Sequence, residues 1–238
     1  MYLSPRSVES SRKPEPIERF RRIQPRKSRF IRTLSGLVTM LCATAILSGC
    51  STPRPAGHPW KMGYEAPKQF KTNRVLMEPL APIHADMDFQ AAMSSREHLQ
   101  QTLHWGWPSE DFTVEQNRKD LERHWQEFVN NEGYAYTVLK PDGSECLGCV
   151  YLSPAKEQNL PEPVARLAMW VREDQLDGNL DKHLFDSVMR WIREDWPIET
   201  VVIKLHTDNE RMIRLARKAG LTESPGENET QILFVWAR

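Results

Sequence analysis

The chain has 238 residues, of which 27% are charged and 39% hydrophobic, and its 32 basic side chains balance its 32 acidic ones. This length suits one compact domain with an additional tail. Domains that bind nucleic acid usually carry a clear basic excess, so the balanced charge argues against nucleic acid as a partner.

The N-terminal segment departs from this balance. Residues 1–33 carry ten Arg or Lys and three Glu, and they lead into the uncharged apolar stretch 34–47. This stretch is shorter than the ~20 apolar residues that a membrane-spanning helix needs, so the basic flank and the apolar core together predict a secretory signal. The tetrapeptide LSGC at 47–50 resembles the lipobox of bacterial lipoproteins.

The lipobox resemblance implies cleavage before Cys50 and acylation of its thiol. The lipid would hold the protein on an envelope membrane, the outer membrane if the organism has one. An uncleaved signal anchor and a cytoplasmic protein with an unused signal are the alternatives. We therefore expect a signal segment at 1–49, a lipidated tether rich in Pro and Gly at 50–70, and a folded domain at 71–238.

Strand-like and helix-like segments alternate through the folded part. Strands are expected at 74–77, 134–139, 147–152, 165–171, 201–205 and 231–236, and helices at 83–93, from the capping box of Thr113 and Gln116, at 180–192, and from Asn209 to Gly220. The order is one strand, two helices, three strands, then helix, strand, helix and strand. It predicts an α/β (α+β) fold with a mixed central sheet flanked by helices.

Two cysteines of the folded part, Cys146 and Cys149, form a single CxxC pair. Structural zinc needs four ligands and no second pair is present, so the sequence does not predict a metal. Residues three apart on a regular strand face opposite sides, and a disulfide would therefore need a bulge at Gly148. We expect two packed thiols.

Three segments of the folded part resemble the GNAT (GCN5-related N-acetyltransferase) family. They are the opening strand at 72–80, the strand at 148–152, and the last helix from Asn209 to Gly220-Leu221. A hairpin of the type Thr-Val-Leu-x-Pro-x-Gly at 137–143 adds to the similarity, which extends over about 71–238. The resemblance implies a GNAT-like fold and an acyl-CoA-dependent activity.

In that family, acetyl-CoA lies between two splayed strands, which correspond here to 165–171 and 201–205. The resemblance places Val171 beside the pantetheine arm, and Gln175, Gly178 and Asn179 at the pyrophosphate, with Asn209 also assigned to the cofactor. A helix N-terminus can bind such an anion through its free amides without a metal. Acetyl-CoA or another acyl-CoA is therefore the expected co-substrate.

This loop also departs from the family pattern. Leu180 replaces a small residue, so its side chain is expected to obstruct the phosphate. Four carboxylates surround the loop, namely Glu173, Asp174, Asp177 and Asp181. These features predict weak CoA binding at best, and an ordinary helix start with Asn179 as its cap is the alternative interpretation.

The catalytic groups are less well defined by the sequence. The family often has a Tyr acid on the last helix, and Ala216 occupies that position here. Glu173 is the carboxylate nearest to the expected site, which makes it the candidate base, whereas Tyr136 and Tyr151 are expected to lie in the core.

Two functions from different classes follow. The first is an N-acyltransferase that transfers an acyl group from acyl-CoA to an amine on a small molecule or a protein. The second is a catalytically degenerate binding module on the cell envelope, with Trp105 and Trp107 at the rim of its cleft.

Overall fold

The computed structural model describes residues 57–61, 63–157 and 160–238. The expected signal segment and Cys50 lie outside the described residues, so cleavage and lipidation stay predictions. Among the described helices, none is both long enough and apolar enough to cross a bilayer.

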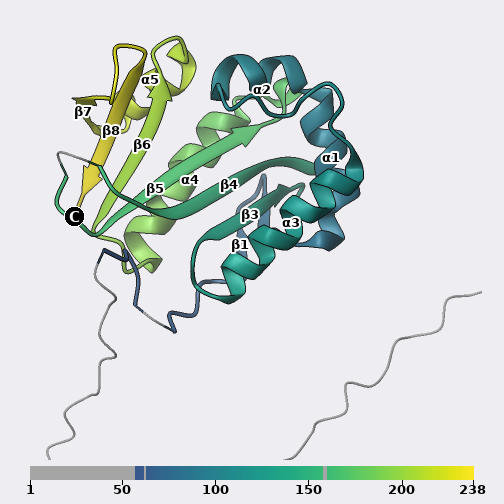
Figure 1. The fold of residues 1–238 in the computed structure, drawn as a ribbon, viewed down its shortest axis with the longest axis horizontal. Coiled ribbons are helices and arrows are strands. Elements are labelled where there is room, and N and C mark those ends of the chain that lie inside the picture. Colours follow the sequence, from purple (N-terminus) through teal and green to yellow (C-terminus); the bar gives the residue numbers. More distant parts are fainter. Residues whose placement is uncertain (1–56, 62, 158–159) are drawn as a thin grey trace, which may run out of the picture. The chain divides into compact units, whose positions relative to one another are not determined.

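One sheet of eight strands organises the domain in the order β1-β2-β3-β4-β5-β6-β8-β7 (Figure 1). The strands are β1 (Phe70–Lys71), β2 (Leu76–Pro79), β3 (Tyr134–Leu139), β4 (Cys146–Ala155), β5 (Val164–Val171), β6 (Thr200–His206), β7 (Thr222–Pro225) and β8 (Gln231–Ala237). All neighbours are antiparallel except β5 and β6. The mixed α/β sheet expected from the sequence is confirmed.

Five α-helices and two short 3-10 helices connect the strands within the described ranges. They are η1 (Pro82–His84), α1 (Ala85–Ser94), α2 (Arg96–Leu103), α3 (Val114–Val129), η2 (Glu173–Gln175), α4 (Leu180–Asp195) and α5 (Glu210–Lys218). The capping box of Thr113 and Gln116 opens α3 as expected, and Asn209 caps α5.

The observed element order corrects the expected one in three places. The region between β2 and β3 holds three α-helices, because α1 ends at Ser94 and a new helix starts after Ser95, whose φ of −120° and ψ of 18° interrupt the first. The short strands β1 and β7 extend the two edges of the sheet, and neither has the alternating apolar pattern that identifies a strand in sequence. The first expected strand is also shifted, to 76–79.

Helices cover both faces of the sheet. Val150, Leu152 and Leu167 point into one core with Phe185 of α4. The opposite face carries a second core, where Cys149 meets Leu121 of α3 and residues of α1 and α2. Figure 1 shows α4 behind the sheet and α3 in front of it. Alternating side chains along the central strands therefore serve two separate helical layers.

A bulge in β4 brings the two cysteines to the same face. The register between β3 and β4 shifts after Val138, which leaves Leu147 as the additional residue between Cys146 and Gly148. Both thiols are free and fully buried. Gly148 is required there, because a Cβ would lie 2.0 Å from the Trp170 carbonyl oxygen. The expected packed thiols are confirmed, on a bulged strand.

The end of the expected tether is packed on the domain. Trp60 is only 1% exposed, and its indole N–H donates to the Asn131 carbonyl oxygen at 2.8 Å. Its ring also packs against Tyr134 and Trp196. Burying an indole stabilises the fold by roughly 2–3 kcal/mol or more, which the sequence could not reveal in a stretch otherwise rich in Pro and Gly. The segment from Gly57 onward is therefore not a free linker.

Candidate functional site

A crevice opens between β5 and β6, the two parallel strands at the centre of the sheet. They pair only through Ala165 with Val201 and Arg166 with Val202, and beyond these positions they diverge, as Figure 1 shows. Each strand is paired along its full length on its other side. The inner edges at 167–171 and 203–206 therefore present backbone N–H and C=O groups to the crevice, where an extended ligand can hydrogen-bond to them.

One end of the crevice meets the N-terminus of α4. Asn179 precedes this helix with a left-handed φ of 53°, and its side chain makes no capping hydrogen bond. Within the described chain, the first α4 amide with a backbone acceptor is that of His183, which donates to the Asn179 carbonyl oxygen. The amides of Leu180 and Asp181 are thus free for an anion. The interpretation of Asn179 as an ordinary cap is wrong.

The side chain of Leu180 does not obstruct this end. It is 2% exposed and packs in the core beneath α4, so it points away from the free amides. The expected steric conflict is corrected: Gly or Ala is unnecessary at this position because the side chain has a place in the core. Gly178 also has room, since an added Cβ would only reach ordinary contact distances, 3.5 Å from Arg74 Nη2 and 3.6 Å from the Gln175 carbonyl oxygen.

Two of the four surrounding carboxylates are neutralised by arginines. Arg211 donates from Nη2 to Oδ1 of the buried Asp181 at 2.8 Å, and this interaction raises the pKa of Arg211. Arg172 donates from Nε to Asp174 Oδ1 at 3.0 Å. Arg74 adds a further cation, with Nη2 2.9 Å from the Gly178 carbonyl oxygen. The negative charge expected from the sequence is therefore largely balanced.

The C-terminal turn of α2 covers the crevice. Asn209 holds it there, because its Nδ2 donates to the Thr102 carbonyl oxygen at 3.1 Å while its Oδ1 accepts from the Met212 amide to cap α5. Beneath this cover lie two cavities of about 40 and 50 Å³, bordered by Thr102 and Leu103. Each can hold water, but ligand pockets usually measure roughly 300–1,000 Å³. Neither cavity is large enough for a ligand of that size as it stands.

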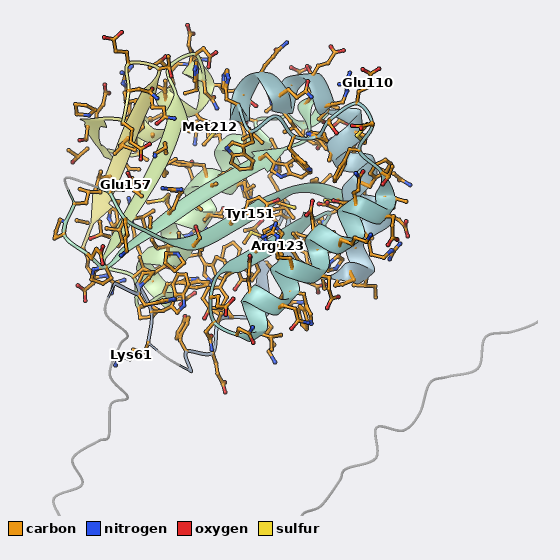
Figure 2. The ribbon with its side chains drawn as sticks, viewed as in Figure 1. Lys61, Glu110, Arg123, Tyr151, Glu157 and Met212 are labelled. Atoms are coloured by element: carbon orange, nitrogen blue, oxygen red, sulfur yellow. The ribbon has the colours of Figure 1, made fainter. Side chains whose placement is uncertain are left out.

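A larger hollow of about 340 Å³ lies on the α1–α3 side of β5. Its lining residues include Asp88, Trp105, Trp107, Asp120, Arg123, His124, Tyr151, Arg166 and Ala168. Figure 2 labels Tyr151 and Arg123 from this hollow and Met212 from the crevice. Trp105 and Ala168 line both spaces, and Tyr151 is the cross-strand partner of Ala168. The hollow and the crevice therefore meet at the middle of β5.

Burial sets the protonation of the hollow's side chains. It raises the pKa of the Tyr151 phenol, which accepts from the Trp170 indole N–H at 3.3 Å. Burial also lowers the pKa of His124, and the neighbouring Arg123 lowers it further. At neutral pH the hollow thus presents a protonated phenol and a neutral imidazole, one able to donate and the other able to accept a proton.

Asp88 adds a buried carboxyl to the same hollow. Burial raises its pKa, although Asn117 donates from Nδ2 to Oδ2 at 2.9 Å and the Cys149 thiol contacts Oδ1 at 3.2 Å. On the other side of the hollow, the buried Nε of Arg166 has no hydrogen-bond partner among the described residues. The hollow therefore offers a carboxyl group and a guanidinium group, which suit a polar acceptor substrate of positive or negative charge.

The structure brings most of the predicted cofactor residues together. Val171 lies at the buried end of β5 beside the cavity of about 50 Å³. Gln175, Gly178 and Asn179 form the loop before α4, and Asn209 lies between the crevice and its cover. Glu173 is exposed in a shallow surface depression that shares Leu176 and Arg211 with the crevice, and its amide donates to the Ser95 hydroxyl. Nothing in its surroundings tests a catalytic role, which stays a prediction.

The sequence did not identify the residues of the hollow. Tyr151 was expected in the core, but it is half-buried and lines the hollow, whereas Tyr136 is fully buried as expected. Asp88 and His124 come from different helices, and no spacing in the sequence links them. One available signal was Asp88 itself, a carboxylate on the otherwise apolar buried face of α1.

Comparisons with known proteins agree on the fold. The family model described as Acetyltransferase (GNAT) domain matches residues 74–222. Similar solved structures include the ribosomal-protein-S5-alanine acetyltransferase from Vibrio fischeri, at 13% identity and a TM-score of 0.59, covering 71% of this chain and 96% of that one. A search of curated proteins found no match.

Two further similar structures were solved with ligands. RimL, the ribosomal L7/L12 alpha-N-protein acetyltransferase, in complex with coenzyme A, shares 15% identity at a TM-score of 0.59, with 70% of this chain and 95% of that one covered. The microcin C7 self-immunity acetyltransferase MccE, in complex with acetyl-CoA and AMP, shares 14% identity at a TM-score of 0.59, with 73% and 98% covered.

Proposed function

This chain belongs to the GNAT acetyltransferase domain family, and from that premise we propose that it transfers an acyl group from acyl-CoA to an amine. One observation carries the proposal. The uncapped N-terminus of α4, with its free amides at Leu180 and Asp181, lies at the end of a crevice with unpaired strand edges. Such an arrangement fits a diphosphate joined to an extended polar arm.

The cofactor would occupy the crevice in two parts. The diphosphate lies against the free amides of Leu180 and Asp181, where the helix dipole and Arg74 attract it. The pantetheine arm follows the inner edge of β5 past Val171, and the thioester then reaches the neighbourhood of Ala168. RimL and MccE, whose structures hold coenzyme A and acetyl-CoA, support a CoA thioester as the donor.

The acceptor amine would enter from the hollow. It attacks the thioester carbonyl as a neutral amine, so one proton must leave it and the departing thiolate must gain one. His124 is suited to receive the proton of the amine, since its pKa is lowered and the imidazole is neutral. Glu127 contacts Nδ1 at 3.0 Å, so Nε2 is the nitrogen that can accept this proton. In the structure, Arg123 Nη2 contacts Nε2, and the amine would replace it there. The Tyr151 phenol is suited to donate near the thioester. Glu173 remains the alternative base.

The cellular setting is part of the proposal. The basic flank, the apolar stretch and the tetrapeptide ending in Cys50 support a lipid-anchored envelope protein. Mass spectrometry of the N-terminus in the native host tests this directly. A diacylated Cys50 is the expected result, and an intact N-terminal segment would refute it.

A non-catalytic envelope binding module is the second candidate. The observation that favours it is the cover over the crevice, where the two cavities of about 40 and 50 Å³ leave no room for a cofactor unless the turn of α2 moves. In this case the hollow alone would hold a ligand, with the half-exposed Trp105 at its rim.

Calorimetric titration with CoA and with pantetheine distinguishes the two candidates. We expect CoA to bind at least ~10-fold more tightly, because the helix terminus adds up to about 2 kcal/mol for the diphosphate. Gly178→Trp should abolish this difference by filling the loop, whereas Gly178→Ala should retain it, since a methyl group fits there. Equal binding of both probes, or none, would refute the acyltransferase proposal.

A further inference from the structure

Three potential metal ligands meet at the mouth of the crevice. His104 is the residue that follows α2, His206 ends β6, and Asp208 lies in the turn before α5. His104 Nε2 lies 3.0 Å from Asp208 Oδ1, and His206 Nδ1 lies 2.6 Å from the same oxygen. Ligand atoms of all three residues lie within 4.8 Å of one another.

The backbone holds these ligands from both sides. His104 has a left-handed φ of 54°, a conformation that costs free energy for a residue other than Gly and directs its ring toward the start of α5. The bond from Asn209 to the Thr102 carbonyl oxygen fixes the two segments independently. The Asn209 amide also donates to the His206 carbonyl oxygen at 3.0 Å. The three residues are therefore held close together before any ion arrives, and only their rings have to reorient.

The chemistry of the ligands selects the class of ion. Two imidazoles and one carboxylate suit Zn²⁺, Ni²⁺ or Cu²⁺, whereas Mg²⁺ and Ca²⁺ prefer oxygen ligands. The side chains of His104, His206 and Asp208 are 36%, 25% and 56% exposed, so water can complete the coordination. The imidazole rings stack at 3.7 Å with a 23° angle, and they must turn apart so that the ion lies in both ring planes.

A second group of possible ligands, Asp88 with Cys146 and Cys149, is a poorer site. All three are completely buried, and both thiols would have to ionise inside the core. Asp88 is also already hydrogen-bonded to Asn117. The group of His104, His206 and Asp208 needs no thiol to ionise, and it is open to solvent.

We propose that His104, His206 and Asp208 bind a divalent transition-metal ion of the Zn²⁺ class, and that this ion fastens the turn of α2 over the crevice. The ion would join the end of α2 to β6 and so hold in place the turn that borders both cavities. Metal binding itself does not depend on the proposed function. Its effect on acyl-CoA entry does rest on that function.

Titration of the full chain with Zn²⁺ and with Co²⁺ tests the site. We expect one bound ion, and at least ~10-fold weaker binding in His104→Asn and in Asp208→Asn. Asn suits the left-handed backbone at 104, so this variant should fold normally. His58→Asn is the matched control, because it removes a partly exposed histidine that packs against Trp60, away from the three ligands.

The Co²⁺ spectrum separates the two ligand groups. Imidazole and carboxylate ligands give weak visible bands, whereas thiolates add an intense charge-transfer band. A strong thiolate band, or Zn²⁺ affinity unchanged in both variants, would overturn the proposed site.

CoA titration with and without Zn²⁺ tests whether the ion holds the turn of α2 over the crevice. We expect Zn²⁺ to weaken or slow CoA binding in the native chain and to have no effect in His104→Asn. If Zn²⁺ binds but CoA binding is indifferent to it, the fastening role is wrong. If Zn²⁺ binds and CoA never does, the proposed function fails while the metal site stands.

Discussion

The two spaces on either side of β5 differ in what lines them. The crevice toward β6 is narrow and bordered by strand edges, and its end is formed by free amides of α4. The hollow toward α3 is several times larger and is lined by side chains such as Tyr151, His124 and Asp88. Backbone groups bind polar features that many ligands have in common, whereas a particular set of side chains selects one acceptor molecule. Under the proposed function, the cofactor side would thus be generic to the fold, and the acceptor side particular to this chain.

The largest expected effect lies on the hollow side. Tyr151→Phe and His124→Gln should each lower kcat by about 10²–10⁴-fold, because each removes a group placed to transfer a proton. Their affinity for CoA should stay unchanged, since neither residue borders the loop before α4. Steady-state kinetics together with CoA titration measure both effects.

Glu173→Gln serves as the matched comparison for these variants. Glu173 lines neither the hollow nor the two cavities of the crevice, so we expect nearly full activity. If this variant loses activity while Tyr151→Phe retains it, the base was correctly assigned from the sequence, and the assignment of the hollow is wrong.

A smaller effect is expected on the crevice side. Asn209→Ser keeps a good helix cap for α5 but cannot reach the Thr102 carbonyl oxygen, so it loses one hydrogen bond worth about 0.5–1.5 kcal/mol. Unfolding in urea should show a loss of this size, and CoA should bind about 2–10-fold more tightly because the cover opens more easily. Weaker CoA binding would show instead that Asn209 contacts the cofactor.

The smallest effect concerns Asp88 and the pH dependence of stability. Burial raises its pKa, so above the ordinary value near about 4 the unfolded chain releases a proton that the folded chain retains. Stability contributed by this residue therefore falls as pH rises toward the raised pKa. Asp88→Asn stays neutral and should lose this dependence, so its advantage over the native chain should grow with pH.

Urea unfolding over a pH series measures this difference. Asp111→Asn is the control, because the Ser109 hydroxyl lowers the pKa of this exposed carboxyl. Its removal should therefore give the variant no stability advantage over the native chain that grows with pH. An Asp88→Asn variant that loses stability equally at every pH would contradict a protonated carboxyl in the hollow.

The same comparison explains what the sequence could predict. The order of the central strands and the position of the loop at Gln175–Asn179 depend on local patterns, and the structure agrees with them, although α2 and the edge strands β1 and β7 were missed. Errors arose where side chains could turn two ways. Leu180 was expected to block the loop but enters the core, and Asp181 was expected to repel an anion but pairs with Arg211. Neither orientation is encoded in local spacing.

For a related reason, the sequence could not predict the hollow or the cover over the crevice. Asp88, His124 and Tyr151 meet only after α1, α3 and β4 pack together, and the hydrogen bond between Asn209 and Thr102 joins residues 107 positions apart. The burial of Trp60 depends likewise on distant partners such as Trp196. Contacts of this kind follow from tertiary packing, which periodicity does not report.

Amide hydrogen exchange with and without CoA tests the central claim most directly. If the α4 N-terminus binds the diphosphate, the amides at 178–182 should become strongly protected when CoA is added, and pantetheine should protect them far less. Protection of β5 or of the hollow without any change at 178–182 would contradict the claim that this uncapped helix terminus is the cofactor's anion site.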